Sequence, residues 1–108
     1  MKLVIAIVNN DDSMAVSSAL TRHKFSVTKL STTGGFLMIG NTTYLIGVED
    51  DRVDRLKEIV KKYSSKRTHT VTTKDSFGYG FSEGEMSKEV TVGGATLFVL
   101  DVESMEKY

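Results

Sequence analysis

Residues 2–8 read Lys-Leu-Val-Ile-Ala-Ile-Val, and this stretch decides how the rest of the chain folds. It is short, apolar at every position after the lysine and rich in β-branched side chains, which predicts a strand buried on both faces. A polar run at residues 9–12 ends it. Asp12 or Ser13 can then cap a first helix. The apolar side of that helix comprises Met14, Val16, Ala19 and Leu20.

Two further strand patterns and a second helix follow the first helix. Residues 25–30 alternate between apolar and polar side chains, and residues 42–48 are rich in β-forming residues. We expect these segments to pair as an antiparallel hairpin with a loop near residues 33–40. The second helix is expected to begin at Asp50 or Asp51, where carboxylates favour the positive end of the helix dipole, and to end near residue 63. Its buried face comprises Val53, Leu56, Ile59, Val60 and Tyr63.

The last third of the chain contains a short strand, a long loop and a closing strand. Residues 68–73 carry Thr and Val and suit a short strand, and residues 74–88 form a polar loop with three glycines. Residues 89–102 form the closing strand, which Gly93-Gly94 interrupts. The order is β-α-β-β-α-β with one additional short strand. This order predicts a single domain over residues 1–108 with an α+β fold of the ferredoxin-like type, in which both helices cover one face of an antiparallel sheet.

The other face of that sheet needs a partner. Residues 3–8 and 97–100 are apolar at successive positions, so both faces of these strands are apolar, whereas the helices cover only one. A monomer would expose a large apolar patch. We therefore expect a symmetric homo-oligomer whose sheets pack against each other, with clefts between subunits as natural ligand sites.

The composition limits the classes of function. Fourteen basic and fourteen acidic side chains give a formal net charge of zero, and the predicted central strands are aliphatic, so we expect no nucleic-acid partner. The chain has no cysteine, which excludes disulfides and thiolate metal sites and fits a reducing compartment. The N-terminal apolar run is too short for a signal peptide, and no segment is long enough for a membrane span. We therefore expect a cytoplasmic protein.

No catalytic or metal-binding pattern stands out in the sequence. His23 and His69 are the two histidines, and neither belongs to a motif with ligand or nucleophile spacing. There is no Gly-x-Ser-x-Gly, Walker-type or Gly-x-Gly-x-x-Gly run. The pairs Asp51–Arg55 and Glu58–Lys62 have the spacing of solvated i, i+4 pairs that support a helix. We predict no catalytic residues, no metal and no cofactor.

Residues 28–43 are the strongest candidate for a binding site. They combine three glycines with hydroxyl side chains, the amide of Asn41 and the ring of Phe36. Taken singly, Gly34-Gly35 suits a plain turn and Gly93-Gly94 suits a β-bulge. Taken together with the hydroxyls, the amide and the ring, the glycines favour close approach of a small planar, polar and phosphate-bearing molecule.

The same segments resemble a known family. The resemblance rests on residues 28–37, 40–43, 51–54 and 92–99, which occur in the same order in the PII-like cyclic di-AMP receptors of Gram-positive bacteria. It covers nearly the whole chain, from residue 2 to residue 101. It implies a homotrimer of ferredoxin-like subunits with three cyclic di-AMP sites in the clefts between neighbours, and a signal receptor rather than an enzyme. It also implies that loop rearrangement passes ligand occupancy to a partner protein, whose identity the sequence does not give.

The resemblance also implies the ligand-binding positions, residue by residue. They are Ser26, Thr28, Gly35, Phe36, Leu37, Asn41, Gly47, Gly93 and Gly94. The chain departs from the family at Ser26, where an arginine that contacts the ligand is usual, and in residues 74–88, which lack the usual prolines. These departures leave open a second interpretation, the same fold binding another anionic nucleotide such as ATP. The third interpretation is a protein-interaction scaffold that binds no ligand.

Overall fold

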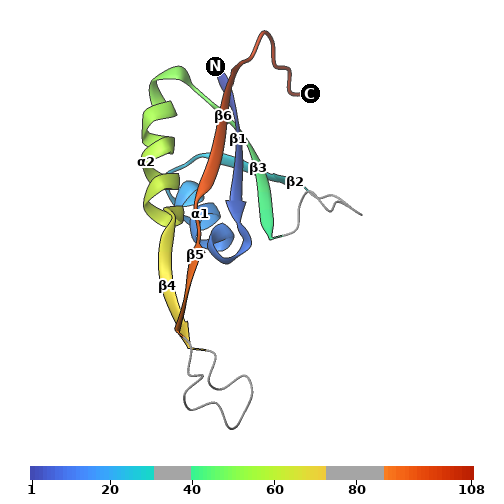
Figure 1. The fold of residues 1–108 in the computed structure, drawn as a ribbon. Helices are drawn as coiled ribbons and strands as arrows, with labels where there is room; N and C mark the ends of the chain where they lie inside the picture. The colour runs from blue at the N-terminus through green and yellow to red at the C-terminus, as the bar shows by residue number, and fades with distance from the viewer. Residues whose placement is uncertain (31–39, 73–86) are drawn as a thin grey trace.

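The computed structural model describes residues 1–30, 40–72 and 87–108, and within them the chain forms strands and two α-helices (Figure 1). The first half contains β1 (Lys2–Asn9), α1 (Asn10–Arg22), β2 (Ser26–Leu30) and β3 (Asn41–Val48). The second half contains the 3-10 turn η2 (Asp50–Arg52), α2 (Val53–Ser64), β4 (Arg67–Thr72), β5 (Ser87–Val92) and β6 (Ala95–Asp101).

Four of the strands form one antiparallel sheet in the order β2-β3-β1-β6. β1 lies in the middle and pairs with β3 along its whole length, from Lys2 opposite Val48 to Asn9 opposite Asn41. On its other side β1 pairs with β6. This order, with a helix after the first strand and another before the last, confirms the predicted ferredoxin-like α+β arrangement.

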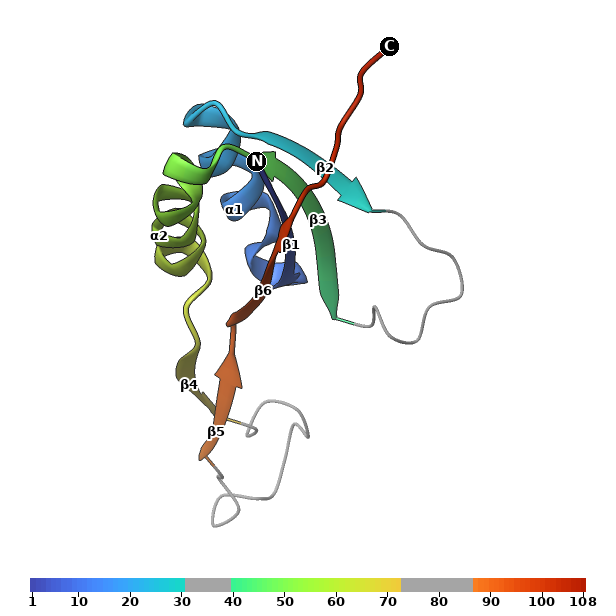
Figure 2. The ribbon, with the colours of Figure 1, turned by 90° about the horizontal axis from the view of Figure 1, so that it is seen from above.

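Both helices cover the same face of this sheet, and the core lies between the helices and the sheet (Figure 2). Val4, Ala6 and Val8 of β1 are fully buried beneath the helices. They belong to one cluster with α1 and α2, whose buried residues include Val16, Ala19, Leu20, Leu56, Ile59 and Val60. The alternation of side chains along β1 therefore sends one set of residues into the core and the other set to the opposite face.

We call the opposite face of the sheet, which no helix covers, the open face. Its central residues are Leu3, Ile5 and Ile7 of β1, which are only half-buried. Ile5 lies opposite Phe98 of β6, and the side chain of Phe98 is 52% exposed. The prediction that β1 is buried on both faces is thus wrong for a single chain, since the open face is apolar but uncovered.

β4 and β5 pair in a separate two-stranded sheet that extends away from the four-stranded sheet (Figure 1). The closing strand is interrupted at Gly93-Gly94, as predicted, and this break separates β5 from β6. β5 begins at Ser87, two residues before the predicted start. Most of the predicted loop 74–88 and most of the predicted loop 33–40 lie outside the described residues.

α1 begins at another residue than predicted, whereas the predicted second helix begins at Asp50 as a 3-10 turn. α1 begins at Asn10 because Asn9, the last residue of β1, is the N-cap: its Oδ1 accepts a hydrogen bond of 2.9 Å from the backbone N–H of Asp11. The turn η2 precedes α2, which begins at Val53. Arg55 was predicted to pair with Asp51. In the structure its Nη1 lies 3.3 Å from Oε2 of Glu58 instead.

Candidate functional site

Three of the predicted ligand-binding residues lie at one end of the open face. Ser26 of β2 is directly opposite Gly47 of β3. Val27 packs against the core, so its neighbours Ser26 and Thr28 lie on the open face, where both are exposed. A Cβ on Gly47 would lie 3.0 Å from Cε of Met1, the flexible end of an exposed side chain.

Asn41 lies at the other end of β3. It is six positions away from Gly47, which corresponds to roughly 20 Å of extended strand. Gly40, just before it, has φ +81°, and its carbonyl accepts a hydrogen bond of 2.9 Å from the backbone N–H of Asn10. Asn10 also accepts a bond of 2.6 Å from Thr42 Oγ1. The start of β3, and with it Asn41, is therefore held against the start of α1.

A cleft of about 540 Å³ joins Asn41 to the distant Gly93-Gly94. It is lined by the end of α2 and the start of β6, together with one residue each of β1 and β3. Its lining comprises Ile7, Asn41, Lys57, Val60, Lys61, Ser64, Ser65, Lys66, Gly93, Gly94, Ala95, Thr96 and Leu97. Ser26, Thr28 and Gly47 are not part of this lining. The structure thus divides the predicted site residues that it describes into two groups at opposite ends of β3.

Gly93 and Gly94 adopt a backbone conformation that favours glycine. Their φ angles are +82° and +95°. A Cβ on Gly93 would lie 2.7 Å from Nη1 of Arg67 and 2.8 Å from the carbonyl oxygen of Ser65. The backbone N–H of Gly94 donates a hydrogen bond to the carbonyl of Ser64, the last residue of α2. The break in the closing strand is therefore packed against the end of α2 and the base of β4.

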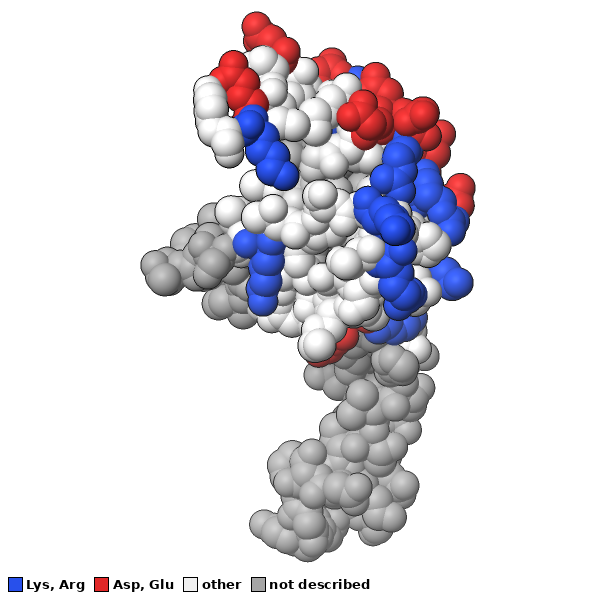
Figure 3. Space-filling view, turned by 180° about the vertical axis from the view of Figure 1, so that it is seen from behind, with Lys and Arg blue, Asp and Glu red and all other residues white. Residues whose placement is uncertain are grey.

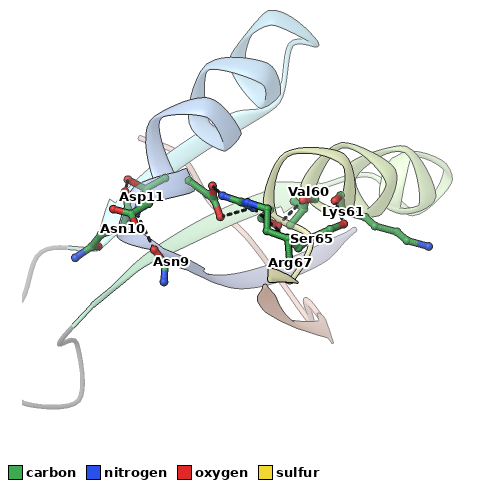
Figure 4. Close-up of polar contacts among 10 residues, drawn as sticks. Asn9, Asn10, Asp11, Val60, Lys61, Ser65 and Arg67 are labelled. Carbon is green, nitrogen blue, oxygen red and sulfur yellow. Dashed lines mark hydrogen bonds and ion pairs between the residues drawn. The ribbon is translucent and has the colours of Figure 1, made fainter. Parts of the chain in front are cut away.

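An ion pair between Asp12 and Arg67 lies beside Gly93 and was not predicted from the sequence. Figure 4 shows Arg67 extending from the base of β4 towards the start of α1. Its Nη2 donates to Asp12 Oδ1 at 2.7 Å and its Nη1 to Oδ2 at 3.3 Å. The hydrogen bonds to Asp12 raise the pKa of Arg67 further above its usual value. A pair separated by 55 positions leaves no local signal in the sequence.

Three lysines of the cleft were also missed. Lys57 and Lys61 lie one helical turn apart on α2, and Lys66 follows the helix. Seen from behind, Lys and Arg side chains gather in a column on the side where α2 lies, below a group of acidic side chains (Figure 3). Lys57 and Lys61 are at positions i and i+4, and like charges at this spacing slightly destabilise a helix. The unfavourable spacing is the one signal in the sequence that could have indicated a function for these two lysines.

The structure does not test the remaining predictions about the site. Gly35, Phe36 and Leu37 lie outside the described residues. Within residues 1–30, 40–72 and 87–108 no group of three His, Cys, Asp or Glu side chains is placed to hold a metal ion. Over the same residues no helix is long and apolar enough to cross a membrane.

Two comparisons with known proteins bear on this geometry. A model of the cyclic-di-AMP receptor family matches residues 1–108. A crystal structure of a functionally unknown protein from Pediococcus pentosaceus ATCC 25745 is 42% identical in sequence and superposes with a TM-score of 0.76. That match covers 99% of this chain and 96% of the other. The chain therefore belongs to the cyclic-di-AMP receptor family.

Proposed function

We propose that this protein is a signal receptor that binds cyclic di-AMP in clefts between the subunits of a homotrimer. The observation that carries the proposal is the division of the predicted site into two groups at opposite ends of β3, in a chain of the cyclic-di-AMP receptor family. Ser26, Thr28 and Gly47 form the first group. Asn41, Gly93 and Gly94 form the second.

The distance between the groups supports a site made by two subunits. Roughly 20 Å of strand separates Asn41 from Gly47, too far for one small cleft within one chain. A ring of subunits joins unlike surfaces, so that one end of a subunit meets the opposite end of its neighbour. Such an arrangement would bring the first group of one subunit beside the second group of the next. It would also cover apolar residues of the open face such as Phe98, which is half exposed in a single chain.

The chemistry of the two groups suits a cyclic dinucleotide. The hydroxyls of Ser26 and Thr28 can donate to phosphate oxygens, and the amide of Asn41 can both donate to and accept from the edge of an adenine. Glycines allow the backbone at residues 93 and 94 to approach the ligand closely. Gly35, Phe36 and Leu37 complete the proposed site, with the Phe36 ring packed on a base. The proposed site requires none of these groups to break a bond, so the proposed role is binding and not catalysis.

We further propose that ligand occupancy is passed to a partner protein through the β4–β5 hairpin. Gly93 and Gly94 directly follow β5, and Arg67 at the start of β4 contacts the position that a Gly93 side chain would occupy. A ligand that contacts these glycines therefore acts at the base of the hairpin. Residues 73–86 connect β4 to β5 along the chain, and we propose that this segment contacts the partner.

Calorimetric titration with cyclic di-AMP, ATP and cyclic di-GMP tests the proposal, together with the mass measured by light scattering during gel filtration. We expect a trimer that binds one cyclic di-AMP per chain and neither of the other nucleotides. Binding of ATP without cyclic di-AMP would assign the site to another anionic nucleotide. The absence of heat with all three would favour a protein-interaction scaffold.

A further inference from the structure

Lys66 lies beside one of the proposed ligand-binding glycines. If Gly94 carried a Cβ, that atom would be 3.7 Å from Cβ and 3.8 Å from Cε of Lys66. The ammonium group is bonded to Cε, so the positive charge of Lys66 lies next to the backbone of Gly94. Lys57 and Lys61 line the same cleft from α2. Three cationic side chains therefore surround a space that also contains Asn41.

These lysines carry charge that the described part of the protein does not neutralise. Among the ion pairs formed within residues 1–30, 40–72 and 87–108, none includes Lys57, Lys61 or Lys66. Glu58, an acidic residue on the same helix, is paired with Arg55. The other acidic residues near α2 lie at its beginning, in η2 and at Asp54. The chain has zero net charge, but this cleft has a local excess of positive charge.

The lysines are also not required to cap the helix. Basic side chains near the C-terminus of a helix often satisfy its last carbonyl groups. In α2 two of the last four carbonyls, those of Lys61 and Ser64, have other donors, and none of these donors is a lysine. Ser64 Oγ donates to Val60, Ser65 Oγ donates to Lys61, and the backbone N–H of Gly94 donates to Ser64. The ammonium groups thus remain available to a ligand.

We infer that Lys66, with Lys57 and Lys61, binds a phosphate of the ligand at the Asn41–Gly94 end of the site. The inference rests on the proposed function, since it assigns residues to the same cleft. Each phosphodiester of a cyclic dinucleotide carries one negative charge, and a lysine ammonium is a compact donor for phosphate oxygens. The Lys66 ammonium would hold the phosphate beside Gly94, where the absence of a side chain leaves room for it. Asn41 would then be placed to bond the attached base.

Binding of cyclic di-AMP to the full-length protein is measured by calorimetry for the parent, Lys66→Gln and the triple variant Lys57→Gln/Lys61→Gln/Lys66→Gln. Lys62→Gln is the matched control, because Lys62 neighbours Lys61 on α2 but does not line the cleft. We expect Lys66→Gln to weaken binding about tenfold or more and the triple variant to weaken it further, whereas Lys62→Gln binds like the parent. Raising NaCl from about 50 to 500 mM should weaken the parent more steeply than the triple variant. Thermal unfolding of each variant without ligand checks the fold.

The possible results separate this inference from the proposed function. If the parent binds cyclic di-AMP and both lysine variants bind equally well with the same salt dependence, the inference is overturned and the proposed function stands. An equal loss in Lys62→Gln would also overturn it, because a general charge effect would then explain the result. If the parent does not bind cyclic di-AMP, both fail together.

Discussion

Arg67, the first residue of β4, binds the carboxylate of Asp12 in the first turn of α1 through both terminal nitrogens, at 2.7 and 3.3 Å. Asp12 is 6% exposed and the Arg67 side chain 42% exposed, so a nearly buried acid is paired with a half-exposed base. The guanidinium also donates to the carbonyl of Ser65 at 3.0 Å. One side chain thus joins α1, the end of α2 and the base of the β4–β5 hairpin.

Removing the guanidinium should destabilise the protein and loosen the hairpin. In Arg67→Ala the Asp12 carboxylate remains nearly buried without its partner, a change that is costly because the charge keeps its desolvation penalty. We expect a lower midpoint of thermal unfolding and faster amide hydrogen exchange in β4 and β5. Asp12→Asn should have a similar effect, and the double variant should lose less than the sum of the two single variants.

Asp11→Asn is the control for this prediction, because Asp11 is exposed and Arg67 does not bind it. Its unfolding midpoint should stay close to that of the parent. Equal losses in the Asp11 and Asp12 variants would show that the negative charge near the start of α1 matters and the pair with Arg67 does not.

Gly93→Ala should destabilise the protein more than Gly94→Ala. Both residues have positive φ, which costs about 1–2 kcal/mol for a residue with a Cβ. At Gly93 the new Cβ would also lie 2.7 Å from Arg67 Nη1 and 2.8 Å from the carbonyl of Ser65, whereas at Gly94 it would have only ordinary contacts with Lys66. Chemical denaturation of the two variants measures the difference. A larger loss in Gly94→Ala would contradict the packing described for Gly93.

The sequence was sufficient to predict the sheet, the helices and the break at Gly93-Gly94, because residues 2–8 and the buried positions of α2 carry clear strand and helix patterns. It misplaced the start of α1 because Asn9 serves as both the last residue of β1 and the N-cap. Asp12, one of the two predicted caps, instead accepts hydrogen bonds from Arg67. Contacts between residues far apart in the chain have no periodicity to reveal them.

For the candidate site, the sequence supplied residues but not their arrangement in space. The resemblance supplied residues such as Asn41 and Gly94, and the structure brings these two into one cleft. It could not show that Ser26 lies directly opposite Gly47, since that follows only from strand register. Lys66 was missed because its importance comes from its position beside Gly94, which the fold creates.

Phe98→Glu should separate the proposed oligomer into monomers. Phe98 is 52% exposed on the open face, and a carboxylate there would have to be buried without a partner when subunits pack together. Light scattering during gel filtration should show the mass of a single chain. Met14→Glu provides a matched control, because Met14 is 80% exposed on α1, on the other side of the sheet. Loss of assembly in both variants would indicate a general charge effect.

Asp101→Asn should lower the pKa of Lys2. The Asp101 carboxylate hydrogen-bonds the Lys2 ammonium across β1 and β6 and raises the pKa of Lys2 above about 10.5. Because the folded-state pKa is raised, the stabilisation from this pair is fully present below the unfolded pKa and is lost as pH rises through the folded value. An NMR titration of Lys2 measures the shift. Glu103→Gln, which removes a nearby carboxylate that does not bond Lys2, should leave the pKa of Lys2 unchanged.

Mixed trimers test whether two subunits build each site. Thr28→Ala and Asn41→Ala alter the two groups at opposite ends of β3, and each variant alone should bind cyclic di-AMP weakly without unfolding. If each site takes one group from each of two neighbours, random co-assembly of the two variants restores about a quarter of the sites, because an Asn41→Ala subunit can supply an intact Thr28 to a Thr28→Ala neighbour with an intact Asn41. Calorimetry of the co-refolded mixture should then show high-affinity binding at about a quarter of a ligand per chain. If both groups came from the same chain, every site in the mixture would carry one substitution and no high-affinity binding would return.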